Sequence, residues 1–303
     1  MKARAPGKVV LSGAYSVLHG APAIVSAVSR YVTADTSRPA ELLTDEVKAA
    51  LGTGQTAPWF DASELRERGR KLGLGSSAAI LVASLYALER EASPVSELEL
   101  QQQLFERGLA AHRLAQGGGS GVDVAASTFG GTLVYRLPSP GRPELTPGEL
   151  PGELSLEVWT CPTSASTREL LGAVAELGRS QPSAHRHWLE LQGAAATSAA
   201  ASVQSADSDG FIRALRGQFA ALSGLGLAAG VPIVTAELAE LAPVAEAEGA
   251  ALLPAGAGGG DIALFVGVRP SSETLRGALG AREHHLLSAR LSAPGVGLCP
   301  SAV

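Results

Sequence analysis

The sequence predicts an α+β fold of two domains, and three observations lead to this expectation. The chain has 303 residues, which suits two domains of ordinary size. Segments with the spacing of strands and segments with the spacing of amphipathic helices are mixed along it. A stretch rich in proline, glycine and glutamate, residues 138–152, lies between its halves. We therefore expect one domain over residues 1–152 and a second over residues 153–303.

Apolar periodicity places the individual elements of each half. In the first half we expect strands at 9–11, 23–32 and 131–137 and helices at 63–68, 77–89 and 98–115. In the second half we expect strands at 154–160, 262–268 and 285–291 and helices at 167–177, 188–203, 211–222 and 237–248. Three glycine-rich loops remain between these segments, one near the N-terminus, one in the middle of the first half and one late in the chain.

Composition excludes several classes of partner. The formal charge of −5 and the pI near 5.7 give no basic footprint for a nucleic acid. The longest uncharged stretch, residues 217–236, is interrupted by glycines and Pro232, so we expect a helix and a turn there and no membrane span. Two cysteines show no disulfide or metal spacing, and no signal peptide is visible. We expect a cytoplasmic protein, either a monomer or a homodimer.

The middle glycine-rich loop, residues 73–79, opens directly into a predicted helix. Unpaired N–H groups at a helix N-terminus and glycines that allow close approach suit a triphosphate. Ser76 or Ser77 could offer a hydroxyl to Mg²⁺, or could simply cap the helix. No lysine follows the last glycine, so the loop is not a Walker A motif. Residues 66–71 are highly charged and cannot form the buried strand that precedes a dinucleotide site, which argues against a nicotinamide-dependent oxidoreductase.

The other loops supply single charged residues. Lys8 follows Gly7 at the start of a strand, where a lysine is ordinarily solvated unless it points at a phosphate. Asp123 follows the glycine run 117–121, where an aspartate commonly forms a turn or caps a helix. The late loop, residues 256–261, has no side chain larger than that of an aspartate. Because such a run costs considerable chain entropy, we expect its backbone to approach a ligand or the phosphate cradle at residues 73–79 closely.

Taken together, the loops at residues 5–8, 73–79 and 256–261 resemble the three motifs of GHMP kinases, in the same order and at similar separations. The resemblance extends from residue 5 to about residue 268. Within this superfamily, three segments are similar to those of phosphomevalonate kinases: residues 61–79, residues 119–127, and the strand-to-helix turn after Trp159.

The resemblance implies the two-lobed GHMP kinase fold, with an N-terminal mixed-sheet nucleotide-binding domain and a C-terminal ferredoxin-like αβ domain. It implies phosphoryl transfer from ATP, with Mg²⁺, to 5-phosphomevalonate in isoprenoid precursor synthesis. Lys8 would counter charge on the transferring group, and Asp123 would orient Lys8 and the acceptor, or act as a base for a hydroxyl acceptor. ATP binding is expected at Gly73, Leu74, Gly75, Ser76, Ser77 and Ala78, with Mg²⁺ at Ser76 or Ser77. Acceptor binding is expected at Tyr15, His19, Ser120, Gly121, Ser127, Arg168, Gly258, Gly259 and Asp261.

Some positions depart from the related families. Mevalonate kinases carry a magnesium-binding glutamate on the helix before the aspartate, and the matching residue here is His112, which disfavours that activity. Diphosphomevalonate decarboxylases lack the lysine found at Lys8. Ala14 stands where both kinase families usually have glutamate. Mevalonate kinase, another GHMP kinase such as a sugar kinase, and a catalytically silent binding protein stay as alternatives.

A doubly anionic acceptor also needs cations beyond Lys8. The candidates that lie in or beside the motifs are His19, His112, Arg113 and Arg168. The histidine clusters at 185–187 and 284–285 have no cysteine or carboxylate at metal-ligand spacing, so we expect them on the surface.

Overall fold

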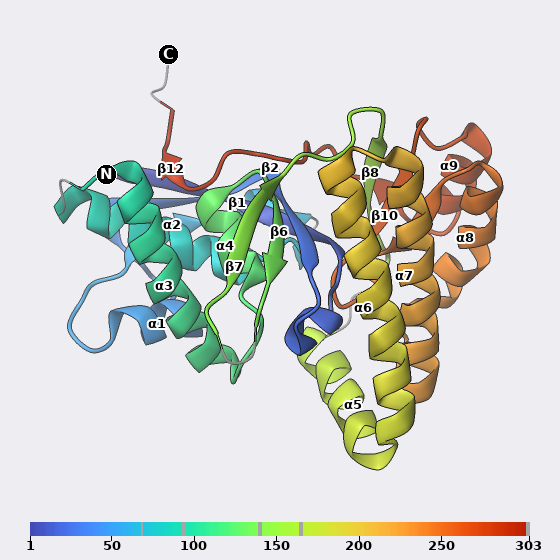
Figure 1. The fold of residues 1–303 in the computed structure, drawn as a ribbon. Coiled ribbons are helices and arrows are strands. Elements are labelled where there is room, and N and C mark those ends of the chain that lie inside the picture. The colour runs from blue at the N-terminus through green and yellow to red at the C-terminus, as the bar shows by residue number, and fades with distance from the viewer. Residues whose placement is uncertain (68, 93–94, 139–140, 164–165, 301–303) are drawn as a thin grey trace. The chain divides into compact units, whose positions relative to one another are not determined.

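The computed structural model describes residues 1–67, 69–92, 95–138, 141–163 and 166–300, and it has the α+β fold that the sequence predicts (Figure 1). The chain divides into two compact units. Unit 1 consists of Met1–Val9, Val25–Leu133 and Ala289–Val303, and unit 2 consists of Val10–Ile24 and Val134–Ser288. Each unit is built from segments that lie far apart in the sequence, and the domain boundary at residue 152 stays a prediction.

The larger sheet has six strands in the order β12-β1-β2-β6-β7, with β3 also paired to β2. Its strands are β1 (Lys2–Ser12), β2 (Ala23–Pro39), β3 (Pro58–Asp61), β6 (Thr132–Arg136), β7 (Glu144–Gly148) and β12 (Gly297–Leu298). The apolar runs predicted as strands lie inside β1 and β2, which extend further because their outer residues pair through the backbone despite polar side chains. β7 lies within the proline- and glycine-rich stretch 138–152, for which no strand was predicted.

Among the residues that the structure describes, four α-helices belong to unit 1. They are α1 (Asp45–Leu51), α2 (Ser76–Ala92), α3 (Glu97–Gln116) and α4 (Val122–Phe129). A capping box between Ser96 and Glu99 starts α3, and Gly117 ends it in the left-handed conformation. The helix expected at 63–68 was wrong: a single 3₁₀ turn, η2 (Ser63–Leu65), precedes a two-stranded hairpin of β4 (Arg66–Glu67) and β5 (Arg70–Lys71). Only Leu65 of η2 is buried, so packing does not extend the helix.

Unit 2 contains an antiparallel sheet of four strands in the order β11-β8-β10-β9. The strands are β8 (Ser155–Thr160), β9 (Ala251–Pro254), β10 (Ile262–Gly267) and β11 (His285–Leu286). The helical elements are η1 (Ser16–His19), α5 (Thr167–Ser180), α6 (Pro182–Ser205), α7 (Ser208–Ala229), α8 (Ala236–Ala247) and α9 (Glu273–Gly280). The strand expected at 285–291 is only two residues long, and α9 was not predicted. A core around Trp159, Leu252 and Phe265 joins this sheet to α8 and α9.

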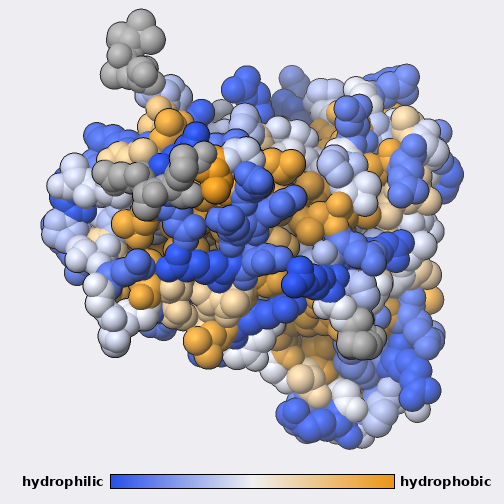
Figure 2. Space-filling view, turned by 60° about the vertical axis from the view of Figure 1, so that its left-hand side comes forward, coloured by the Kyte–Doolittle hydropathy of each residue, from blue (hydrophilic) through white to orange (hydrophobic). Residues whose placement is uncertain are grey.

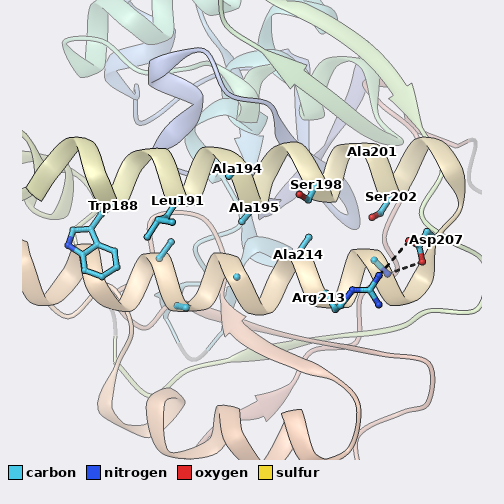
Figure 3. Close-up of a pocket in the computed structure, with 14 residues that line it drawn as sticks. Trp188, Leu191, Ala194, Ala195, Ser198, Ala201, Ser202, Asp207, Arg213 and Ala214 are labelled. Carbon is cyan, nitrogen blue, oxygen red and sulfur yellow. Dashed lines mark hydrogen bonds and ion pairs between the residues drawn. The ribbon is translucent and has the colours of Figure 1, made fainter. Parts of the chain in front are cut away.

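Helices α6 and α7 are consecutive and lie side by side, with Asp207 capping α7 through Gly210 N at 2.8 Å (Figures 1 and 3). A groove of about 710 Å³ runs between them. Its floor is lined mainly by alanine, glycine and serine, with Trp188 toward one end and the pair of Asp207 and Arg213, 3.9 Å apart, toward the other (Figure 3). The residues expected to bind ATP or the acceptor do not line this groove.

The surface mixes hydrophobic and hydrophilic residues. In the view of Figure 2, hydrophobic residues form separate patches interrupted by hydrophilic ones. Leu42, Leu114 and Leu227 are among the most exposed large hydrophobic side chains. Within the part of the chain that the structure describes, no helix combines the length and the hydrophobicity needed to cross a bilayer. The uncharged run 217–236 forms the end of α7, a turn at Gly230 and the start of α8, as the sequence predicts.

Candidate active site

The first two glycine-containing loops lie against each other in unit 1. Lys8 N donates to Leu74 O at 2.8 Å, and Lys8 Nζ donates to Gly73 O at 3.2 Å. A Cβ at Gly7 would come within 2.8 Å of Leu74 O. At Gly75, which has a φ of +75°, a Cβ would lie 3.0 Å from both Cγ and Cε of Lys8. Glycine at these two positions therefore lets the lysine side chain pack directly on the loop that precedes α2.

The middle loop leads into α2 as the sequence predicts. Gly73 and Gly75 both have left-handed φ values, +69° and +75°, and the carbonyl of Gly75 accepts the first helical bond, from Ala79 N at 3.1 Å. Ser76 and Ser77, in the first turn, are half-buried. The N–H groups of a first helical turn have no intrahelical partner and carry the positive end of the helix dipole. This backbone therefore fits the phosphate groups of a nucleotide.

The central loop delivers Asp123 on a helix that was not predicted. Gly121, in the left-handed conformation, is the N-cap of α4, and Asp123 is the second residue of the helix. Oδ1 of Asp123 accepts a hydrogen bond from Val124 N at 3.0 Å. The buried Ser127 donates from Oγ to Pro6 O at 2.8 Å, which fixes α4 to β1 two residues before Lys8. Ser127, expected at the acceptor site, thus has its hydroxyl engaged by the backbone.

His112 on α3 lies beside Asp123. Its Nε2 is 3.1 Å from Oδ2 of Asp123, and the side chains of the two residues are 4% and 21% exposed. Burial alone would raise the pKa of Asp123, but the hydrogen bond and charge of His112, together with the charge of Lys8, lower it to about 2. Burial lowers the pKa of His112, but the bond to Asp123 and the charges of Asp123 and Glu46 raise it above its ordinary value. The carboxylate is therefore ionised at any physiological pH.

This role of His112 was missed by the sequence reasoning, which offered the residue as a cation for the acceptor phosphate. A signal was present: Phe105, Leu109 and His112 share the helical spacing of the buried face of α3. A histidine on an apolar face next to a glycine loop that carries an aspartate points to a buried pair. The spacing of 11 residues between His112 and Asp123 alone did not reveal it.

In unit 2, Tyr15 holds the late glycine loop. Its hydroxyl donates to Ala257 O at 2.7 Å, and Gly256 N donates to Val10 O at 3.2 Å. Tyr15 is buried, and burial raises the pKa of its hydroxyl far above the ordinary value. The segment around Tyr15 and the late loop are therefore joined by hydrogen bonds, and the expected approach of this loop to a ligand or to the phosphate cradle stays a prediction.

The late loop is also tied to the turn before α8. Gly259 N donates to Ile233 O at 3.0 Å. A Cβ at Gly258, where φ is +79°, would overlap Ile233 O. Cys161 N donates to the main-chain carbonyl of Asp261 at 3.1 Å, while Oδ1 of Asp261 is buried and has no hydrogen-bond partner among the described residues. The loop thus presents backbone and one carboxylate at the end of β8.

The other expected acceptor residues lie at separate places. His19 is exposed and faces His185, with ring centroids 5.6 Å apart; burial and the charge of His185 lower its pKa. Arg168 is exposed in the first turn of α5, and the adjacent residues 164–165 lie outside the described part of the chain. Ser120 is half-buried in the loop before α4, in unit 1.

One histidine expected on the surface is buried. His284 is 2% exposed, and its Nδ1 lies 3.1 Å from Arg282 O, so the surface expectation was wrong for this residue. It precedes β11, and its main-chain N–H donates to Leu279 O, near the end of α9, at 3.1 Å. His187 is exposed, as expected.

Residues 63–131 match the family model described as "GHMP kinases N terminal domain". This segment contains the loop before α2, His112 and Asp123. A solved structure, Streptococcus pneumoniae phosphomevalonate kinase in complex with phosphomevalonate and AMPPNP, has the same fold, with a TM-score of 0.77 and 19% identity over 96% of this chain and 99% of that one. These comparisons show a match to the GHMP kinase N-terminal domain over residues 63–131 and a shared fold over nearly the whole chain.

Two curated relatives are similar to this chain over more than half of its length. The chain is 28% identical to phosphomevalonate kinase of Streptomyces sp. (strain CL190), over 85% of this chain and 87% of the relative. It is 30% identical to mevalonate kinase of Archaeoglobus fulgidus, over 60% of this chain and 66% of the relative. Its similarity therefore lies among the kinases of the mevalonate pathway.

Proposed function

We propose that this protein transfers a phosphoryl group from ATP to 5-phosphomevalonate, forming 5-diphosphomevalonate. The similarity to the Streptomyces phosphomevalonate kinase, which extends over most of both chains, supports the reaction class. The observation that favours a phosphate acceptor over an alcohol is the contact of Asp123 with His112, 3.1 Å apart, which lowers the pKa of the carboxyl.

A general base works best when its pKa lies near the operating pH, because it must both take a proton and be available to do so. A carboxyl with a pKa of about 2, held against His112, is a poor base at neutral pH. An alcohol acceptor such as mevalonate must lose a proton, and removing a general base from such a reaction costs roughly 10²–10⁴-fold. The phosphate of a monoester is already largely ionised at neutral pH, since its second pKa is about 6. Asp123 is thus suited to orient charge rather than to remove a proton.

Lys8 is the residue to which we assign charge stabilisation. Its ammonium is held by Gly73 O, and its side chain lies on Gly75, so its position is fixed before any substrate binds. A fixed cation that meets charge developing on a transferring phosphoryl group lowers the barrier without reorganisation. Asp123, on which the charge of Lys8 acts, provides the opposite charge that orients this ammonium.

ATP supplies the phosphoryl group, and the backbone of residues 75–78 would hold its phosphates. Ser76 or Ser77 would offer a hydroxyl to Mg²⁺, which commonly keeps few protein ligands and takes the rest from phosphates and water. Across the described residues, no three His, Cys, Asp or Glu side chains are grouped so as to hold a metal ion. Acceptor contacts from Tyr15, His19, Ser120, Gly121, Arg168, Gly258, Gly259 and Asp261 remain part of the proposal.

The test is a coupled ADP-release assay with ATP and Mg²⁺ that compares 5-phosphomevalonate, mevalonate and galactose. We expect turnover with phosphomevalonate and its loss in Lys8→Met. The matched control is Lys48→Met, because Lys48 is an exposed lysine paired with Asp45 on the surface of α1, and this variant should keep wild-type turnover. Wild-type turnover in Lys8→Met would contradict the assignment of that lysine.

Mevalonate kinase is the second candidate, favoured by the 30% identity to the Archaeoglobus enzyme. If only mevalonate is turned over, mevalonate and not phosphomevalonate is the acceptor. Binding of ATP without turnover of any acceptor would favour a catalytically silent member. Asp123→Asn separates the two kinase reactions further: with a phosphate acceptor the loss should stay below the roughly 10²-fold minimum expected for removing a base.

A further inference from the structure

Four ionisable side chains from four elements of unit 1 form a series around the candidate site. Lys8 comes from β1, Asp123 from α4, His112 from α3 and Glu46 from α1. Lys8 and Asp123 belong to the motifs that the family similarity explains. His112 and Glu46 lie outside those motifs, and both are buried.

Asp123 is held through both of its carboxylate oxygens. Oδ1 accepts from Val124 N at 3.0 Å, and Oδ2 lies 3.1 Å from Nε2 of His112. With the backbone bond alone, the carboxylate could still turn about its terminal torsion, which is broad in aspartate. The second contact, from a different helix, removes that freedom. His112 therefore fixes the plane in which Asp123 presents its charge.

His112 is itself closed off from solvent. Its side chain is 4% exposed, and a Cβ on Gly119 would lie 3.9 Å from its Cε1, so the loop before α4 passes over the ring. Arg113 Nε donates to Gly119 O at 3.3 Å and holds this loop to α3. His112 is thus placed to act through Asp123.

The charges around the ring favour a protonated imidazole. Asp123 on α4 and Glu46 on α1 are the carboxylates whose charges raise the pKa of His112, while Arg113, the next residue on α3, lowers it. Glu46 is 7% exposed and accepts from Gln116 Nε2 at 3.1 Å, so its position is also fixed. The charges of two anions and one cation act on the ring, and the protonated imidazole forms an ion pair with the Asp123 carboxylate at 3.1 Å.

We propose that His112 is a positioning residue for phosphoryl transfer: through Nε2 it fixes the Asp123 carboxylate as an oriented anion beside Lys8, and so adapts the site to acceptors that are already ionised. The positioning of Asp123 rests on the geometry within unit 1, whereas the consequence for the acceptor rests on the function proposed above. Glu46 supports this arrangement by keeping negative charge near the imidazole.

The first experiment requires no activity. The chain has six histidines, so ¹H–¹³C spectra of the imidazole Cε1–H groups resolve few signals, and His112→Gln identifies that of His112. We expect His112 in the wild-type protein to titrate above the ordinary histidine pKa of about 6.5. In Asp123→Asn the titration midpoint of His112 should fall, because burial lowers the pKa of the imidazole and less negative charge is then left to raise it. An unchanged midpoint in Asp123→Asn would overturn the pairing, whatever reaction the protein catalyses.

The second experiment measures kcat and KM with the acceptor that the wild-type protein uses. His112→Ala should lower kcat by roughly 10–10²-fold, the scale expected when a reacting arrangement moves by up to 1 Å, while KM for ATP stays within about threefold. His112→Gln, which can still donate a hydrogen bond but carries no charge, should recover part of the loss. The matched control is His284→Ala, a buried histidine of unit 2, which should lose thermal stability but keep kcat.

The outcomes separate the inference from the proposed function. The midpoint of the His112 titration could shift in Asp123→Asn while kcat stays unchanged in both His112→Ala and His112→Gln. That result would contradict the positioning role, even if the protein is an active kinase. Should His112→Ala fail to fold, the Gln variant and the Asp123→Asn titration still decide. The protein could also turn over mevalonate while the His112 midpoint falls in Asp123→Asn. That result would keep His112 as the positioning residue, but it would overturn the proposal that His112 adapts the site to ionised acceptors.

Discussion

Gly75→Ala adds one methyl group at the contact between the candidate phosphate loop and Lys8. The new Cβ would lie 3.0 Å from Cγ and from Cε of Lys8. Carbon atoms in ordinary contact are about 3.5–4.0 Å apart, so the lysine side chain must move by about 0.5–1 Å. Gly75 also has a φ of +75°, a conformation that costs a residue with a side chain about 1–2 kcal/mol.

These two effects should appear in different measurements. The backbone strain lowers the free energy of unfolding by about 1–2 kcal/mol, which is a decrease of a few degrees in Tm. The displacement of Lys8 lowers kcat, by up to roughly 10²-fold for a shift of about 1 Å at a reacting group. Stability is measured by thermal or urea unfolding, and kcat by the ADP-release assay.

Gly230→Ala is the control for strain alone. Gly230 has a φ of +68° at the end of α7, and a Cβ there would have no heavy atom within 4 Å. It should lose a similar amount of stability while kcat stays unchanged. In a Lys8→Met background, Gly75→Ala should have little further effect on turnover, because its target is already absent. If Gly75→Ala and Gly230→Ala lose equal stability and Gly75→Ala keeps full turnover, the proposal that glycine at position 75 is needed to place Lys8 is refuted.

Two further predictions concern stability. Glu157→Ala removes a buried carboxylate that is 2.6 Å from Arg276, and we expect a loss of about 3 kcal/mol at pH 7, the lower end of the range for broken buried pairs because Arg276 is partly exposed. Burial raises the pKa of Glu157, but hydrogen bonds from Ser271 and Arg276 lower it below 4.5. The stabilisation is therefore present above pH 4.5 and disappears as the pH falls through the pKa of the folded state. If the urea midpoints of wild type and Glu157→Ala differ equally at pH 7 and well below pH 4.5, this prediction is contradicted. Gly224→Ala places a methyl group against the ring of Trp188 and should cost about 1–3 kcal/mol, measured by Tm. Gly217→Ala on the same helix meets only Ala195 Cβ at 3.5 Å and should stabilise by up to about 1 kcal/mol, and equal effects of the two substitutions would argue against the Trp188 contact.

Long periodic segments were predictable from the sequence because their pattern depends on neighbours a few residues apart. The helices α2, α3, α6, α7 and α8 were all expected, within a few residues at their ends except for α6 and α7. Short elements were not: α4, α9 and β7 are five to eight residues long, too short for their own sequences to show a period. The helix prediction at 63–68 was wrong for a related reason: its charged residues are compatible with a helix, but no packing stabilises one there.

The sequence by itself determined the family motifs, because each is a short run whose chemistry is local. Glycines beside a helix start, Lys8 on the first strand and Asp123 after a glycine run could all be identified without coordinates. Only the tertiary structure decided what surrounds them. It placed the lysine side chain on Gly75, the ring of His112 against Asp123 and the charge of Glu46 near that ring. A carboxyl pKa depends on burial and on charges from other elements, and packing of separate helices sets both.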